Sequence, residues 1–87
     1  MRIWIKEFLD NRMMRDMVVE DYSDNSRTRK VFEALDKVCA EFDLGKPIWL
    51  DKNIREFQAH SRTRFYQDSF MEAVDFDFID FHVIEED

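Results

Sequence analysis

Carboxylates gather near the C-terminal end of the chain, and they are the residues with the clearest capacity for chemistry. Asp75, Asp77 and Asp80 lie within the segment DFDFID, and three further acidic residues occupy positions 85–87. In an extended segment Asp75 and Asp77 share a face, where they could hold a hard cation such as Mg²⁺ and support phosphoryl transfer. The alternative is the solvated side of an edge strand, whose charges discourage aggregation. We favour this alternative, because a metal site needs a third ligand from elsewhere.

The sequence Ser-Arg-Thr-Arg occurs twice, at residues 26–29 and 61–64. If two helices pack antiparallel, a copy at one helix start and a copy near the other helix end lie together. Arg27, Arg29, Arg62 and Arg64 would then form a basic patch suited to a phosphate or an acidic partner. The alternative, which we favour, is two solvated helix ends that balance the acidic C-terminal segment.

The other residue types used in catalysis are few and scattered. His60 and His82 have no zinc-motif spacing to each other or to Cys39, the only cysteine. One glycine cannot supply the loops that cradle phosphate groups, and no nucleophile motif is present. We therefore expect no catalytic residue, no metal and no cofactor, and we interpret Cys39 as a small buried hydrophobic residue.

Composition limits the classes of protein to which the chain can belong. Its 87 residues fit one domain, and 45% hydrophobic residues with nine Phe can form a core without disulfides. A net charge of −7 opposes binding to nucleic acid or anionic lipid. No apolar run approaches the length of a membrane span, and charged residues interrupt the apolar start before it reaches the length of a signal peptide. These features predict a soluble, cytoplasmic protein.

The longest segment with one clear period runs from Ser26 to Gly45 and predicts a helix. Its apolar stripe comprises Val31, Ala34, Leu35, Val38, Cys39 and Phe42. Ser23, Asp24 and Ser26 are all competent N-caps. Gly45 is expected to provide a left-handed C-terminal stop, and Pro47 prevents continuation.

A second, thinner helical pattern is predicted to start at Asp51 and to fray after His60, with Arg62 and Arg64 near its C-terminal end. Its apolar positions are Ile54, Phe57 and Phe65, with Ser61 in the same stripe. We expect this helix to be partly exposed.

Alternating patterns predict three strands. Residues 2–9 and 13–19 form a hairpin around a turn in which Asp10 and Asn11 tolerate left-handed φ. Glu7 breaks the alternation, which indicates either a frayed strand end or a bulge before Phe8. Residues 78–84 form the last strand and bury their odd-numbered residues.

These elements predict a single α+β domain over residues 1–87 with the order ββααβ. We expect a three-stranded, mostly antiparallel sheet of order 2-1-3, with both helices packed on one face. The uncovered face is too apolar for simple exposure to solvent. Its expected members are Trp4, Lys6, Val18, His82 and Ile84.

We therefore predict a non-enzymatic interaction or self-associating module that binds a protein partner or forms a homodimer. The alternative is a metal-dependent or phosphate-binding enzyme that uses Asp75, Asp77 and Asp80 with Arg62 and Arg64. A third hypothesis is an acidic surface that mimics nucleic acid in the basic cleft of another protein.

Three stretches resemble a group of short bacterial proteins with no assigned function. They are KVFEALDKVCAEFDLGKPIWL, IREF at residues 54–57 and FDFIDFHVIEED. The likeness covers nearly the whole chain and implies a bacterial cytoplasmic protein without an assigned activity. It transfers no catalytic or binding residue.

Overall fold

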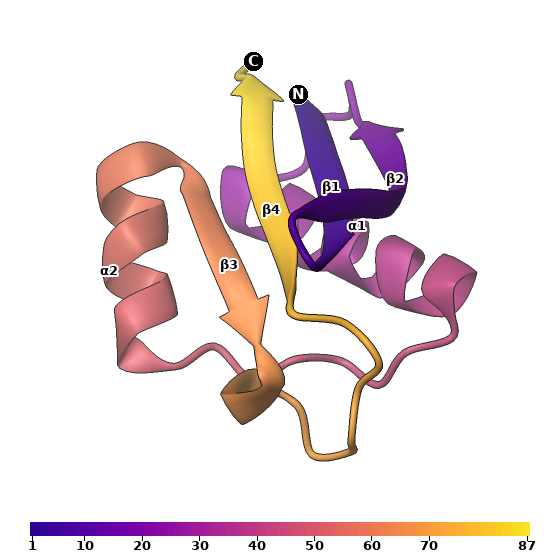
Figure 1. Cartoon of the computed structure of the whole chain (residues 1–87). Helices are drawn as coiled ribbons and strands as arrows, with labels where there is room; N and C mark the ends of the chain where they lie inside the picture. Colours follow the sequence, from indigo (N-terminus) through magenta and orange to yellow (C-terminus); the bar gives the residue numbers. More distant parts are fainter.

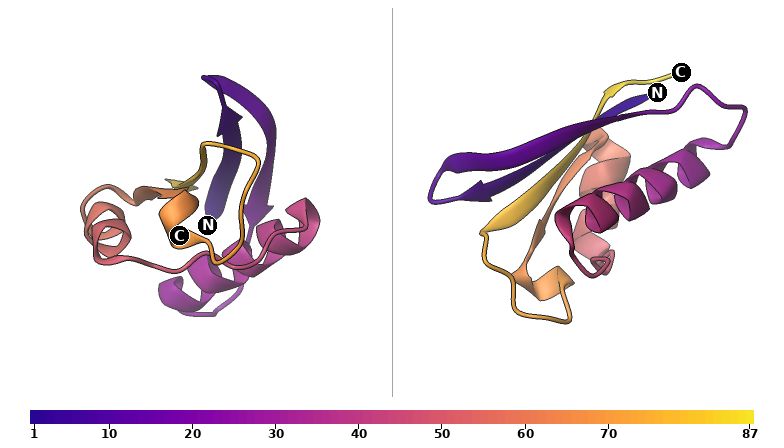
Figure 2. Two further views of the ribbon diagram at one scale, coloured as in Figure 1. Left: turned by 60° about the horizontal axis from the view of Figure 1, so that its bottom comes forward. Right: turned by 90° about the vertical axis from the view of Figure 1, so that its right-hand side faces the viewer.

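The computed structural model describes residues 1–87 as a four-stranded antiparallel sheet covered on one face by two helices. Its elements are β1 (Arg2–Leu9), β2 (Arg12–Glu20), α1 (Arg27–Phe42), α2 (Asp51–His60), β3 (Arg62–Tyr66), the 3₁₀ turn η1 (Gln67–Ser69) and β4 (Phe78–Glu85). The strand order is β2-β1-β4-β3 (Figure 1). Both helices lie on the same side of the sheet, as predicted (Figure 2). Neither helix is long and apolar enough to span a lipid bilayer.

The prediction of a three-stranded sheet is wrong, because β3 lies where a fraying helix was expected. Ser61 has φ 55° and ends α2 in the left-handed conformation. The next residues alternate in burial, with Thr63 and Phe65 buried toward the helices. β3 pairs with β4 along its whole length, so β1 keeps β2 and β4 as its predicted neighbours and the fourth strand extends the sheet beyond β4.

The N-terminal hairpin has the predicted form. Asp10 and Asn11 have φ of 52° and 64°, which matches the mirror-image turn that a two-residue hairpin loop needs. The register of β1 against β2 shifts between Glu7 and Phe8, so the predicted irregularity is a bulge. The Asp77 carboxylate accepts a hydrogen bond from the Asp10 backbone N–H at 2.9 Å and ties the turn to the segment before β4.

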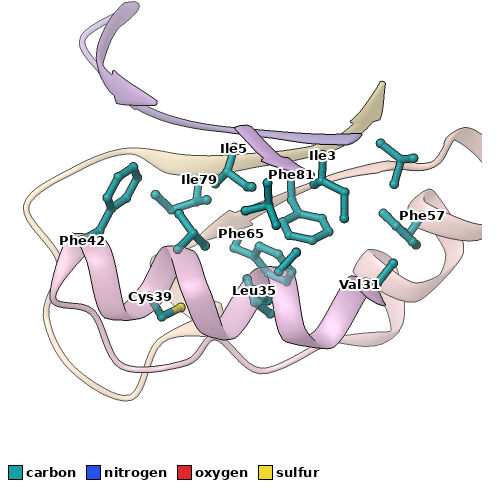
Figure 3. Packing of buried hydrophobic residues seen from close by; sticks show 14 of the residues in the cluster. Ile3, Ile5, Val31, Leu35, Cys39, Phe42, Phe57, Phe65, Ile79 and Phe81 are labelled. Atoms are coloured by element: carbon teal, nitrogen blue, oxygen red, sulfur yellow. The ribbon is translucent and has the colours of Figure 1, made fainter. Parts of the chain in front are cut away.

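The core fills the space between the sheet and α1 (Figure 3). Ser26 is the N-cap, with its side chain accepting from the Arg29 N–H, so one of the three candidate caps is used. The predicted glycine stop is wrong, because α1 ends at Phe42 and Asp43 adopts the left-handed conformation with φ 55°. The Gly45 N–H instead donates to the Glu72 carboxylate at 2.7 Å.

A buried polar group attaches α2 to the edge of the sheet. The Asn53 side chain is fully buried and donates to the Thr63 hydroxyl and to the Arg64 carbonyl, both at 2.9 Å. Because β3 is an edge strand, no neighbouring strand pairs with its outer side. The contact with Asn53 satisfies a backbone carbonyl on that side.

Charged groups near the two chain ends form a second polar cluster. The Asp87 carboxylate contacts the Met1 amine and the ammonium of Lys30, which is only 3% exposed. Arg27 at the start of α1 holds Glu86 through two hydrogen bonds of 3.0 and 3.1 Å. These pairs fix the end of β4 against α1.

Candidate functional site

The sheet face opposite the helices, the open face, carries its side chains in three rows across the four strands. Written in the order β2-β1-β4-β3, the mixed row is Val18, Trp4, His82 and Arg62, the charged row is Asp16, Lys6, Asp80 and Arg64, and the aromatic row is Met13, Phe8, Phe78 and Tyr66. Each row follows from the register, because residues paired across antiparallel strands project to the same face.

Three of the four members of the aromatic row form a continuous strip of rings. The ring centroids of Phe8 and Phe78 are 5.1 Å apart in a stacked arrangement, and those of Phe78 and Tyr66 are 5.4 Å apart. The Arg64 guanidinium lies 4.4 Å from the centre of the Phe78 ring. Flat groups therefore cover this end of the open face and leave their surfaces partly accessible to solvent.

Asp80 in the charged row is completely buried although it lies on the uncovered side of the sheet. The Arg62 guanidinium covers it with two hydrogen bonds, of 3.0 and 2.5 Å, and Arg64 approaches to 3.7 Å. The hydrogen bonds to Asp80 raise the pKa of Arg62 above its ordinary value. This bidentate geometry fixes both the carboxylate and the guanidinium plane.

Lys6 is the least satisfied charge on the open face. Its side chain is only 8% exposed, its ammonium lies 3.9 Å from the centre of the Trp4 ring, and it forms no ion pair. Trp4 in turn donates from its indole Nε1 to the Asp16 carboxylate at 2.8 Å. The Lys6 Nζ itself keeps contact with solvent, because the one side-chain polar atom that is buried without a hydrogen-bond partner is the Trp49 Nε1.

The structure places Trp4, Lys6, Val18 and His82 together on the open face, and their role as an interaction surface stays a prediction. Burial, followed by the nearby Arg62, lowers the pKa of His82, so its imidazole is neutral at pH 7. Ile84 lies where the pairing of β4 with Arg2 is irregular, and it is 39% exposed.

The aromatic row and the part that β3 contributes to the open face were not predicted from the sequence. Phe8 and Phe78 follow from alternation within single strands, but their contact requires the register between β1 and β4. Arg62 and Arg64 were assigned to a helix end, and Tyr66 was assigned to no element. The alternation of Arg-Thr-Arg-Phe-Tyr was the signal that could have placed them on a strand.

The four arginines of the predicted basic patch are separated. Arg62 and Arg64 lie on the open face with Asp80. Arg27 is paired with Glu86, and Arg29 is paired with Glu33 within α1 on the other side of the sheet. Each guanidinium has an acidic neighbour in the chain, so no free basic patch results.

Two of the three aspartates considered as metal ligands have other partners. Asp80 is bound by Arg62, and Asp77 accepts from the Asp10 N–H. Asp75 is exposed. The structure contains no group of three or more His, Cys, Asp or Glu side chains placed to hold a metal ion. The metal-dependent enzyme therefore stays a prediction that no contact in the structure supports.

A second surface with exposed apolar groups lies on the helical side. A groove of about 310 Å³ between α1 and α2 is lined in part by Phe32 and Ile54, which are 49% and 41% exposed. Trp49 forms its floor and packs edge-on against Phe32 and Phe57. The indole Nε1 of Trp49 is buried without a hydrogen-bond partner.

Comparison with known proteins found no family model, curated protein or solved structure that matches the chain.

Proposed function

We propose that the protein is a non-enzymatic interaction module and that the open face is its binding surface. The observation that carries the proposal is Lys6, whose ammonium lies against the Trp4 ring on this face and forms no ion pair. A docked surface that supplies an acidic group would pair with this ammonium. In the free protein the Trp4 ring and solvent stabilise it.

The side chains of the open face are of the types that carry binding energy. Trp, Tyr and Arg dominate the energetically important positions of protein interfaces, and Phe and Met are also enriched there. The open face contains all five types, and the rings are packed against one another before any partner binds. Little side-chain entropy is lost when such preorganised groups are covered.

The same features favour a protein over a nucleic acid as the partner. The chain carries a net charge of −7, which opposes approach to a phosphate backbone. Arg62 and Arg64 are already engaged by Asp80, which leaves them as flat contact groups with a compensated charge. We place the module in the cytoplasm, in agreement with a single cysteine that is buried and unpaired.

A photo-crosslinking comparison tests which side of the molecule binds. Tyr66 on the open face and Ile54 on the helical groove are both 41% exposed, so they are matched positions for p-benzoylphenylalanine. In living cells we expect the probe at position 66 to capture a protein, either another copy or a different chain, and the probe at position 54 to capture none. Capture at position 54 alone, or at neither position, contradicts the proposal.

A further inference from the structure

The charges of the charged row alternate in sign across the four strands, so each position has the opposite sign when the row is read in the reverse direction. Read from β2 to β3, Asp16, Lys6, Asp80 and Arg64 give the signs minus, plus, minus, plus. Reading the row backwards exchanges every sign. A second copy turned so that its strand order is reversed would therefore place an opposite charge over each of the two exposed members, Asp16 and Arg64, whereas Lys6 and Asp80 lie below them, nearly or completely buried.

We propose that two copies of the chain associate through their open faces around a two-fold axis that runs parallel to the strands. This inference rests on the proposed function and names a second copy as the occupant of the surface. The rotation places β1 opposite β4, and β2 opposite β3, of the second copy. Asp16 then faces Arg64 of the second copy, and Lys6 faces the charge-compensated Arg62–Asp80 ion pair of the second copy.

The other two rows are also compatible with this rotation. Because the axis follows the strands, each row lies over itself in reverse. Phe8 meets Phe78 of the second copy, so aromatic rings pack on aromatic rings. Trp4 meets His82 of the second copy, whose imidazole is neutral, so burial of that ring requires no loss of charge.

The charge order distinguishes this arrangement from the other face-to-face dimer. A two-fold axis across the strands would place every strand over itself. Asp16 would then face Asp16, and Arg64 would face Arg64, of the second copy. Like charges in contact are destabilising, so the alternating row favours the axis along the strands.

The area of the open face is sufficient for a reversible dimer. Four strands about 4.8 Å apart and the eight residues of β1, at about 3.4 Å each, give a face of about 500 Å² per copy. A dimer would bury about 1,000 Å² in total, near the lower limit for a specific interface. We therefore expect a dissociation constant in the micromolar range.

Charge reversal at the two outer strands tests the pairing, because Asp16 and Arg64 are both exposed. In sedimentation velocity, Asp16→Arg and Arg64→Asp should each weaken the dimer roughly tenfold, since each homodimer then contains two like-charge contacts. An equimolar mixture of the two variants should dimerise as the wild type does, because both contacts in the mixed dimer join opposite charges. Asp16→Asn, which retains an acceptor for the Trp4 indole, should give a smaller loss.

Glu41→Arg and Arg55→Asp are matched controls, since both residues are exposed on the helical side and form no ion pair. They should leave dimerisation unchanged. The inference is overturned if the wild-type protein stays monomeric at about 1 mM, which is the dissociation constant of a weak interaction. A mixture that fails to recover dimerisation overturns it as well. If that monomer still crosslinks to another protein through position 66, only the inference fails and the proposed function stands.

Discussion

Asn53 holds the edge of the sheet, and its replacement should destabilise the fold more than the loss of any one contact on the open face. The Asn53 Oδ1 accepts from the Leu50 N–H at 3.1 Å and from the Ser69 hydroxyl at 3.4 Å. Its Nδ2 donates to the Thr63 hydroxyl and the Arg64 carbonyl, both at 2.9 Å. Asn53→Ala removes all of these bonds at a site without solvent access.

The magnitude follows from the backbone groups that lose their partner. The Leu50 N–H and the Arg64 carbonyl both lose their hydrogen-bond partner, and each buried unsatisfied group costs about 1–3 kcal/mol. The two hydroxyls can rotate toward other acceptors, as Thr63 already does toward Glu56 at 2.8 Å. We expect the free energy of unfolding to fall by about 3 kcal/mol. At roughly 5 °C per kcal/mol, Tm should fall by about 15 °C.

Urea unfolding followed by circular dichroism measures this loss. Asn25→Ala is the matched control, because Asn25 is exposed and its side chain forms no hydrogen bond. The control should change the free energy of unfolding by less than about 0.5 kcal/mol. A loss below about 1 kcal/mol for Asn53→Ala would refute the reasoning that these hydrogen bonds hold β3 to α2.

Three further predictions concern burial, acid stability and the hairpin turn. Burial raises the pKa of the Cys39 thiol to about 11, so iodoacetamide should modify Cys39 at pH 8 only after unfolding; rapid modification of the folded protein would contradict this. A hydrogen bond from Lys30 lowers the pKa of Asp87, and hydrogen bonds from Arg27 lower the pKa of Glu86. Both carboxylates therefore stabilise the fold at a pH above their ordinary pKa values, and this contribution is lost as the pH falls below about 4. Urea unfolding at pH 7 and pH 3 should therefore show a smaller acid loss for Asp87→Asn than for the wild type, and an equal loss would argue against this role. Asn11 has φ 64°, so Asn11→Gly should leave Tm unchanged or raise it. Asn11→Val should lower the free energy of unfolding by about 1–2 kcal/mol. Equal Tm values for the two variants would contradict the turn geometry.

Local patterns predicted the elements whose periods differ clearly from their surroundings. The stripe of α1, the alternation of β1 and β4, and the Asp10-Asn11 turn each reflect interactions within a few residues of sequence. The buried Cys39 was predicted for the same reason, because it lies at the edge of the apolar stripe.

β3 could not be predicted in this way. It has five residues, follows α2 without an intervening glycine or proline, and the helical spacing of Phe57 and Phe65 spans the boundary. Pairing with β4 decides its conformation, and that pairing is a contact between distant segments. The rows of the open face could not be predicted for the same reason, since each row depends on the register of four strands. Asn53 likewise reads as an ordinary polar residue until Arg64 lies beside it.

The two tryptophans permit one direct measurement of the central claim. Trp4 lies on the open face, whereas Trp49 forms the floor of the groove between the helices. In protein labelled with 5-fluorotryptophan, fluorine NMR should give two resonances, which Trp4→Phe assigns. With increasing protein concentration we predict that the Trp4 resonance shifts or broadens while the Trp49 resonance stays constant. Movement of the Trp49 resonance alone, or of neither resonance, would contradict self-association through the open face.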